Sequence, residues 1–151
     1  NWRYIDHPVF DYKVVLCQTD LGNVYWIWRE EIVEEKNMKV ARICEIIGNE
    51  EAVNISFSQI YFIFKDTGVV FADFFCSNKA LLNNLIYSGM KNVITLPDFD
   101  LPRYYSPYSD SFRKTINFSY WLSDDLLHKS YFDTNNTYIT KGDVNQDRPN
   151  Y

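Results

Sequence analysis

The sequence predicts a mainly β fold, either a twisted antiparallel sheet or a partly closed barrel, with one or two short helices. Aromatic residues make up 18% of the 151 residues, while glycine and proline contribute five each, a balance that favours packed strands over disorder. Runs of β-branched and apolar residues alternate with short segments rich in turn residues. A chain of this length is expected to form one domain around one core.

Most of the expected strands lie in the first half of the chain. Residues 12–18 and 24–29 flank the turn residues 19–23, so the two runs are expected to pair as a hairpin. Further strands are expected at 38–47, 53–64 and 69–75. The first two of these are long for strands, which predicts bends or bulges within them.

One short helix is expected after these strands. Ser77 is the candidate N-cap and Gly89 the candidate stop, with apolar residues at helical spacing between them. We expect the helix to cover one face of the sheet, with a core that includes Val40, Ile43, Ile46, Leu82, Leu85 and Ile86.

The second half of the chain is less regular. A short strand is expected at 92–96, and three prolines make the following Tyr-rich connection irregular. A final strand at 112–121 and a helical turn at 123–128 are also expected. Residues 1–132 are therefore interpreted as one interaction domain and residues 133–151 as a polar C-terminal tail.

Composition restricts the classes of partner. The formal net charge of −5 disfavours binding to duplex DNA, whose phosphates require a basic face, and suits a basic protein or peptide. No stretch approaches the roughly 20 apolar residues needed to span a bilayer, so no membrane partner is expected. The sequence leaves the oligomeric state open.

The reactive residues do not form a pattern typical of catalysis. Cys17, Cys44 and Cys76 are isolated and lack metal-ligand spacing, so we expect reduced thiols and an intracellular location. His7 and His128 lie in polar surroundings, and the carboxylates occur in adjacent runs typical of a solvated surface. We therefore expect no enzyme activity, no metal and no cofactor.

Aromatic side chains are the most abundant candidates for binding. Most of them are expected in the core, but one small helix cannot cover every aromatic residue on the strands. An exposed aromatic cluster on an acidic domain suits a cationic peptide, because a ring face attracts an ammonium group. The candidate partner-binding residues are Phe57, Tyr61, Phe74 and Phe75.

Several motifs occur in an order that resembles the bromo-adjacent homology (BAH) domain. Residues 40–46 (VARICEI) resemble its opening core strand, and residues 53–57 (VNISF) resemble the next strand. Residues 72–77 (ADFFCS) resemble its "E-L-F-x-S" strand, and residues 86–96 resemble the segment "I-x-G-K-C-x-V". Residues 103–112 are similar to its Tyr-rich hairpin. The resemblance covers roughly residues 10 to 120.

The resemblance implies a nuclear, chromatin-associated module that binds a histone tail or a nucleosome surface. Some BAH domains hold a methylated lysine in an aromatic cage, and Phe57, Phe74 and Phe75 fall near the cage positions, which Tyr61 would join. Lys39 stands where a cage aromatic commonly precedes the opening strand. Whether a methylated lysine is read therefore stays open.

Two alternatives to the BAH interpretation remain. Residues 39–46 and 60–75 also resemble strands of the OB-folds in telomere and replication proteins, which implies protein docking or single-strand binding. Single-strand binding needs basic residues among the aromatics, and residues 53–77 carry only Lys65. The third possibility is an acidic inhibitor or immunity protein that masks a basic enzyme by charge complementarity.

Overall fold

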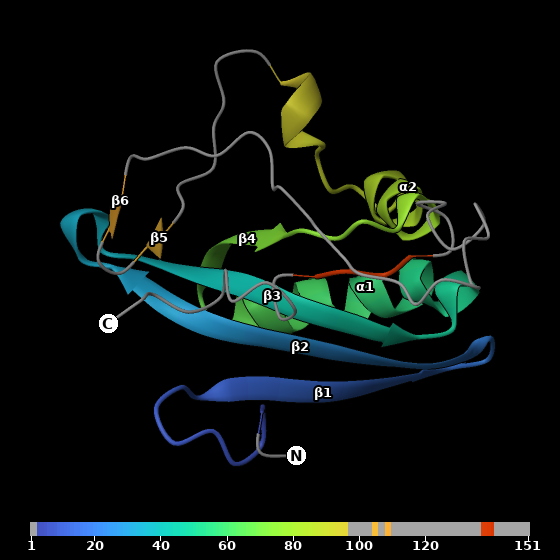
Figure 1. The fold of residues 1–151 in the computed structure, drawn as a ribbon, viewed down its shortest axis with the longest axis horizontal. Helices are drawn as coiled ribbons and strands as arrows, with labels where there is room; N and C mark the ends of the chain where they lie inside the picture. The colour runs from blue at the N-terminus through green and yellow to red at the C-terminus, as the bar shows by residue number, and fades with distance from the viewer. Residues whose placement is uncertain (1–2, 97–103, 106–107, 110–136, 141–151) are drawn as a thin grey trace, which may run out of the picture.

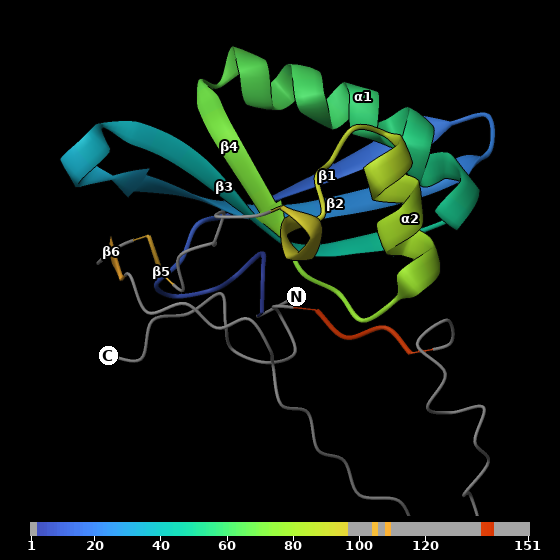
Figure 2. The same ribbon diagram turned by 90° about the horizontal axis from the view of Figure 1, so that it is seen from above.

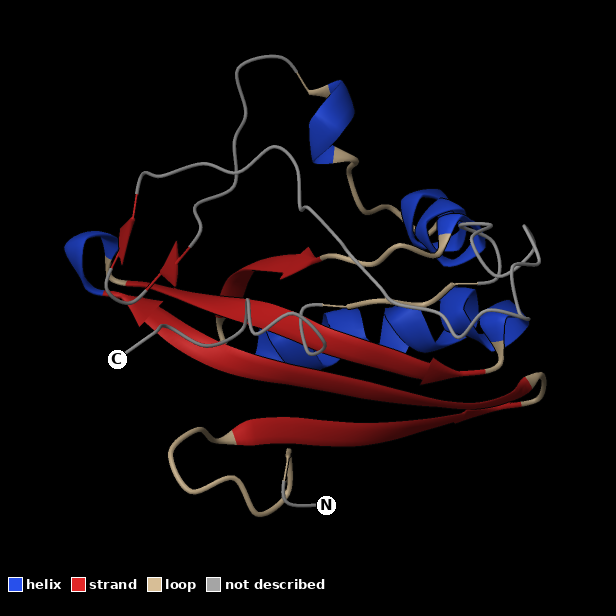
Figure 3. Ribbon diagram, in the orientation of Figure 1, coloured by secondary structure: helices blue, strands red, loops and turns tan. Residues whose placement is uncertain are grey.

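The fold is an open, twisted, four-stranded sheet with helices packed on one face (Figures 1 and 3). The structure is a computed structural model that describes residues 3–96, 104–105, 108–109 and 137–140. The strands are β1 (Tyr12–Thr19), β2 (Gly22–Val33), β3 (Met38–Gly48) and β4 (Val69–Phe74), in the order β1-β2-β3-β4. The prediction of a mainly β fold is confirmed. Of the two predicted architectures, the structure has the twisted sheet, because these strands do not close into a barrel.

The strand directions differ in one respect from the prediction. The pairs β1–β2 and β2–β3 are antiparallel as expected, but β4 runs parallel to β3. A parallel neighbour needs a long crossover, and the chain supplies it as the helix α1 (Glu50–Asp66). The sheet is therefore mixed.

The connections between the antiparallel strands follow from local chemistry. The β1–β2 turn contains only Asp20 and Leu21, and Gly22 closes it with a φ of 128°, a value that favours glycine. The short 3-10 helix η1 (Glu34–Lys36) joins β2 to β3. The bulge expected in the third strand is confirmed, since the β2–β3 register shifts between Ile27 and Trp28.

The strand expected at 53–64 is wrong, because these residues belong to α1. Asn49 caps the helix by accepting a hydrogen bond from the Glu51 backbone N–H at 2.8 Å. The buried side chains of α1 lie on one helical face: the adjacent Ala52 and Val53 are followed by Ser56, Ile60 and Phe64 at spacings of three or four residues. Its many β-branched and aromatic residues favour a strand by propensity, but tertiary packing of the helical face overrides that preference.

The helix α2 (Lys79–Tyr87) confirms the short helix predicted between Ser77 and Gly89, with its N-cap one residue later than expected. Asn78, not Ser77, is the N-cap, and its side chain accepts from the Leu81 N–H at 2.8 Å. Leu85 is buried and Leu82 is half-buried, but Ile86 is 41% exposed, so its assignment to the core is wrong. The expected core residues Val40, Ile43 and Ile46 are all buried.

The chain after α2 matches the expectations only in part. Residues 93–95 form the 3-10 helix η2 (Val93–Thr95) in place of the expected short strand. Two short strands, β5 (Tyr104–Tyr105) and β6 (Tyr108–Ser109), pair as a hairpin within the Tyr-rich connection. The expected strand at 112–121, the helical turn at 123–128 and most of the tail at 133–151 lie outside the described residues.

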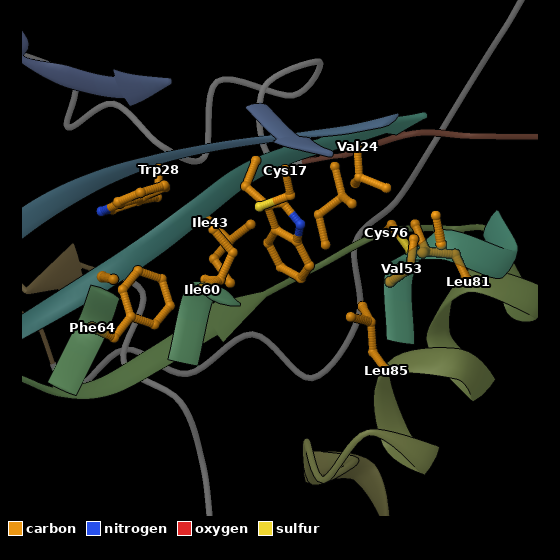
Figure 4. Close-up of a cluster of buried hydrophobic side chains, with 14 residues drawn as sticks. Cys17, Val24, Trp28, Ile43, Val53, Ile60, Phe64, Cys76, Leu81 and Leu85 are labelled. Carbon is orange, nitrogen blue, oxygen red and sulfur yellow. The ribbon is translucent and has the colours of Figure 1, made fainter. Parts of the chain in front are cut away.

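The main core fills the space between the sheet and the two helices (Figures 2 and 4). Trp26 and Trp28 of β2 are both at most 2% exposed and point toward α1. The indole N–H of Trp26 donates to the Ser56 hydroxyl at 2.9 Å, and the Trp28 ring meets the edge of Phe64 at 5.2 Å between centroids. The helix-covered face of the sheet is therefore fully used for packing.

Candidate protein-binding surface

The structure separates the four aromatic residues that the sequence singled out. Phe57 lies half-buried on α1, with its ring 6.1 Å from the Trp26 ring, and Phe74 packs against the same core from β4. Phe75, just after β4, is half-buried, whereas Tyr61 is 55% exposed on α1. Within the described residues, no ring contact joins any two of these four side chains.

Lys39, at the position where the BAH resemblance places a cage aromatic, has a structural partner. Its ammonium group donates to the Thr67 carbonyl oxygen at 2.8 Å and lies 3.4 Å from a carboxylate oxygen of Glu30. These contacts tie β3 to the turn that follows α1 and to β2. The side chain therefore links three elements.

A different apolar surface lies on the sheet face opposite the helices. Leu16 of β1, Tyr25 of β2 and Ile47 of β3 are register partners, so their side chains form one row across three strands. They are 41%, 44% and 46% exposed, and Val14, in the next row, is 38% exposed. We call Val14, Leu16, Tyr25 and Ile47 the apolar row.

The sequence contained a signal for this row. The segments 12–18 and 24–29 are apolar at consecutive positions, not only at alternate ones. Strands of that kind present apolar side chains on both faces. The signal does not say which face the helices cover, nor which side chains line up across the strands.

The N-terminal segment, residues 3–11, covers another part of the same face. Tyr4 and Phe10 pack against the buried side chains of Tyr12, Ile27 and Cys44. The Tyr4 hydroxyl donates to a carboxylate oxygen of Glu45 at 2.6 Å. Burial, together with that hydrogen bond to Glu45, holds the pKa of Tyr4 well above its usual range.

Two buried ion pairs lie on the same face of the sheet. Arg29 pairs with Glu31, and Arg42 lies 3.8 Å from Asp73, with all four side chains no more than 8% exposed. The Arg29 guanidinium also stacks 4.2 Å from the centroid of the Phe10 ring. The opposite charges balance within each pair; Arg29 and Glu31 both lie on β2, whereas Arg42 and Asp73 link β3 to β4.

Two exposed acidic side chains lie at the end of the sheet that carries the apolar row. Asp20 is exposed in the β1–β2 turn, and Glu51 is exposed in the first turn of α1. The two turns are adjacent because the Asn49 N–H donates to the Asn23 carbonyl oxygen at 3.3 Å. Lys13, on β1, has its charge matched by Asp11 at 2.5 Å. The surroundings of the row thus carry an excess of negative charge.

A second feature is the split between β3 and β4. The two strands pair only as far as Ile43 and Phe74, while β3 continues to Gly48. The Ile46 N–H and carbonyl oxygen meet the Tyr138 hydroxyl here, at 2.9 and 2.7 Å.

Residues 137–140 also bond to Cys76 and Ser77, which follow β4 on the other side of the split. The Ser77 N–H donates to the Ile139 carbonyl oxygen at 2.9 Å, and the Ile139 N–H donates to the Ser77 hydroxyl oxygen at 2.8 Å. Thr140 is fully buried and pairs with Cys76 in an isolated bridge. This part of the expected C-terminal tail is therefore integrated into the domain.

The described thiols and acidic groups do not form a metal site. Cys17, Cys44 and Cys76 are all free and buried. Burial raises the pKa of the Cys76 thiol to about 12. In the described ranges, no group of three or more His, Cys, Asp or Glu residues is placed to hold a metal ion. Among the described helices, none has the length and hydropathy required to cross a membrane.

Comparison with known proteins adds no relative. No family model matches the chain, and no curated protein or solved structure matches it at a significant level. The BAH resemblance therefore rests on the sequence motifs alone. One of them, residues 53–57, forms part of α1 rather than a strand.

Proposed function

We propose that this domain is a protein-interaction module that binds a basic amphipathic segment on the apolar row. The observation that carries the proposal is the alignment of Leu16, Tyr25 and Ile47 across three neighbouring strands, each more than two fifths exposed. Scattered exposed apolar residues are normal, whereas a contiguous group on a rigid sheet is typical of a binding surface.

Charge complementarity supports a basic partner. The chain has a net charge of −5, and the exposed carboxylates of Asp20 and Glu51 lie at the end of the sheet that carries the row. Apolar side chains of a bound segment would cover the row, while its lysines or arginines would face these carboxylates. A histone tail or nucleosome surface, and with it a nuclear location, is the setting that the BAH resemblance implies for such a partner.

The test is a calorimetric titration of the whole chain with a histone-tail peptide. We expect Ile47→Ser to weaken binding about fivefold to tenfold, because it removes apolar area from the contact. Ile55→Ser is the matched control, since Ile55 is also an isoleucine that is 46% exposed, but it lies on α1. Equal effects of the two substitutions, or no binding by the unaltered chain, would contradict the proposal.

A second candidate function is binding of a small molecule at the split between β3 and β4. It is favoured by the Ile46 N–H and carbonyl oxygen, which both turn into the split and share a single hydroxyl. A ligand with an extended, amide-bearing arm would take over these two hydrogen bonds. Glu50 and Glu51 in the first turn of α1 disfavour phosphate on that ligand.

Pantetheine is a suitable probe because it combines an extended arm with two amides and no phosphate. We expect it to raise the thermal midpoint of Tyr138→Phe more than that of the unaltered chain, since the variant no longer competes for the Ile46 backbone. Tyr87→Phe, at an 88% exposed tyrosine, is the control. No shift in any of the three proteins would exclude this second function.

A further inference from the structure

The outer edge of β1 carries backbone groups that are arranged for a further strand. β1 lies at one end of the sheet order, and within the described residues no strand pairs with its outer side (Figure 1). The two-residue turn makes Thr19 and Gly22 the closing hydrogen-bonded pair of the hairpin. Because the pattern alternates, Val14, Leu16 and Gln18 point their N–H and C=O groups outward.

A side-chain contact confirms this alternation. The Gln59 side-chain amide of α1 donates to the Gln18 carbonyl oxygen at 3.5 Å, so that oxygen does face away from β2. The contact occupies the Thr19 end of the edge, and the N-terminal segment adjoins the Tyr12 end. As far as the described residues show, the uncovered part of the edge is therefore centred on Val15.

Few of the features that usually protect an edge strand occur in this part of β1. Natural edges are blunted by proline, by bulges, by charged side chains such as lysine, or by a covering helix or loop. The β1–β2 register is regular from Tyr12 to Thr19, and the one lysine, Lys13, has its charge matched by Asp11. The outward-bonding residues Val14 and Leu16 also belong to the apolar row, so an added strand would gain apolar contacts.

We infer that a second copy of this chain pairs with β1, antiparallel and about a two-fold axis at Val15. In that register Val14 of one copy bonds to Leu16 of the other, and Leu16 to Val14, so each outward group finds a partner. Lys13 stands opposite Cys17, and like charges do not meet. The two sheets become one, and the two apolar rows become neighbours. This inference does not depend on the proposed function.

The first test is sedimentation velocity of the whole chain over a range of concentrations. We expect reversible dimers, and we expect Leu16→Pro to weaken the dimer at least about tenfold, because proline removes an outward N–H without removing a bond to β2. Leu16→Thr is the matched control, since it retains the N–H and strand propensity and should dimerise more than Leu16→Pro. The inference would be overturned if the unaltered chain stayed monomeric, or if Leu16→Pro folded and dimerised as fully as the unaltered chain.

A cross-link tests the register itself and does not depend on how well Leu16→Pro folds. Across the proposed axis, Val15 of the two copies forms a non-hydrogen-bonded pair, with Cα atoms about 4.5 Å apart, close enough for a disulfide. Under mild oxidation we expect Val15→Cys to give a covalent dimer and Gln18→Cys, which would face Tyr12, to give none. The reverse result, or equal cross-linking of both, would overturn the pairing.

Discussion

The two faces of the sheet use similar residues for different purposes. Under the helices, Trp26 and Trp28 are buried, and the Trp26 indole N–H bonds to Ser56. On the opposite face the N-terminal segment packs on Tyr12, Ile27 and Cys44, while the apolar row is left exposed. Apolar composition therefore does not distinguish a structural side from a binding side. The packing of other elements against each face makes that distinction.

The largest expected effect tests this contrast directly on β2. Trp28→Ala should lower the free energy of unfolding by about 3–5 kcal/mol, because it leaves a cavity beside Phe64. Tyr25→Ala, three residues away on the other face, should change it by less than about 1 kcal/mol. Urea denaturation of both variants measures the difference. Similar losses would mean that the exposed row is as important to stability as the core.

A smaller difference is expected between two aromatic residues of α1. Phe57→Ala should cost about 1–3 kcal/mol, since Phe57 is only half-buried against Trp26. Tyr61→Ala, one turn later and mostly exposed, should cost less than about 0.5 kcal/mol. Thermal melts of the two variants provide the comparison. If Phe57→Ala reduced histone-peptide binding without loss of stability, the aromatic-cage hypothesis would regain support.

Tyr138→Phe tests how firmly residues 137–140 hold the split between β3 and β4. The substitution removes the hydroxyl that bonds to both the N–H and the carbonyl oxygen of Ile46. We expect a loss of about 1–2 kcal/mol in the free energy of unfolding, at about 0.5–1.5 kcal/mol for each hydrogen bond. Tyr87→Phe should show no loss in the same chemical denaturation. An unchanged Tyr138→Phe would mean that the split is held by other contacts.

The smallest expected effect is a pH dependence caused by Cys76. Its thiol pKa is raised to about 12 by burial, so the folded protein keeps the proton after the unfolded chain has lost it. Stability is therefore unaffected well below pH 9 and falls as the pH rises above it, by up to about 1.4 kcal/mol per pH unit for this group. Denaturation of Cys76→Ala from pH 8 to pH 10 should show a shallower decline. Parallel curves would assign the decline to other groups, such as Cys17.

Local patterns in the sequence predicted the elements whose signals agree with one another. The β1–β2 hairpin, β3, β4 and α2 each combine an apolar run with a turn or a cap, and the structure contains them all. The α1 segment combines residues that favour strands with a spacing that favours a helix, and the prediction followed the residues. The error concealed the crossover, and with it the parallel pairing of β4.

The candidate surface was less predictable than the fold for a geometric reason. Leu16, Tyr25 and Ile47 are far apart in the sequence and meet only through the registers of two strand pairs. A shift of one residue in either register would move a side chain to the other face. The predicted aromatics Phe57 and Phe74 lie half-buried against the core, a position that was unpredictable for the complementary reason. Their packing against the core could not be known before α1 was placed.

The position of residues 137–140 also affects how fast the protein folds. The bond between Tyr138 and Ile46 joins residues 92 positions apart, and the bonds to Ser77 span 60 and 62 positions. Contacts of this range form slowly, because a long loop must be closed before any bond compensates for the lost chain entropy. The hairpin and α1, by contrast, depend on near neighbours. We therefore expect the sheet to assemble before this gap is closed, with residues 137–140 docking last.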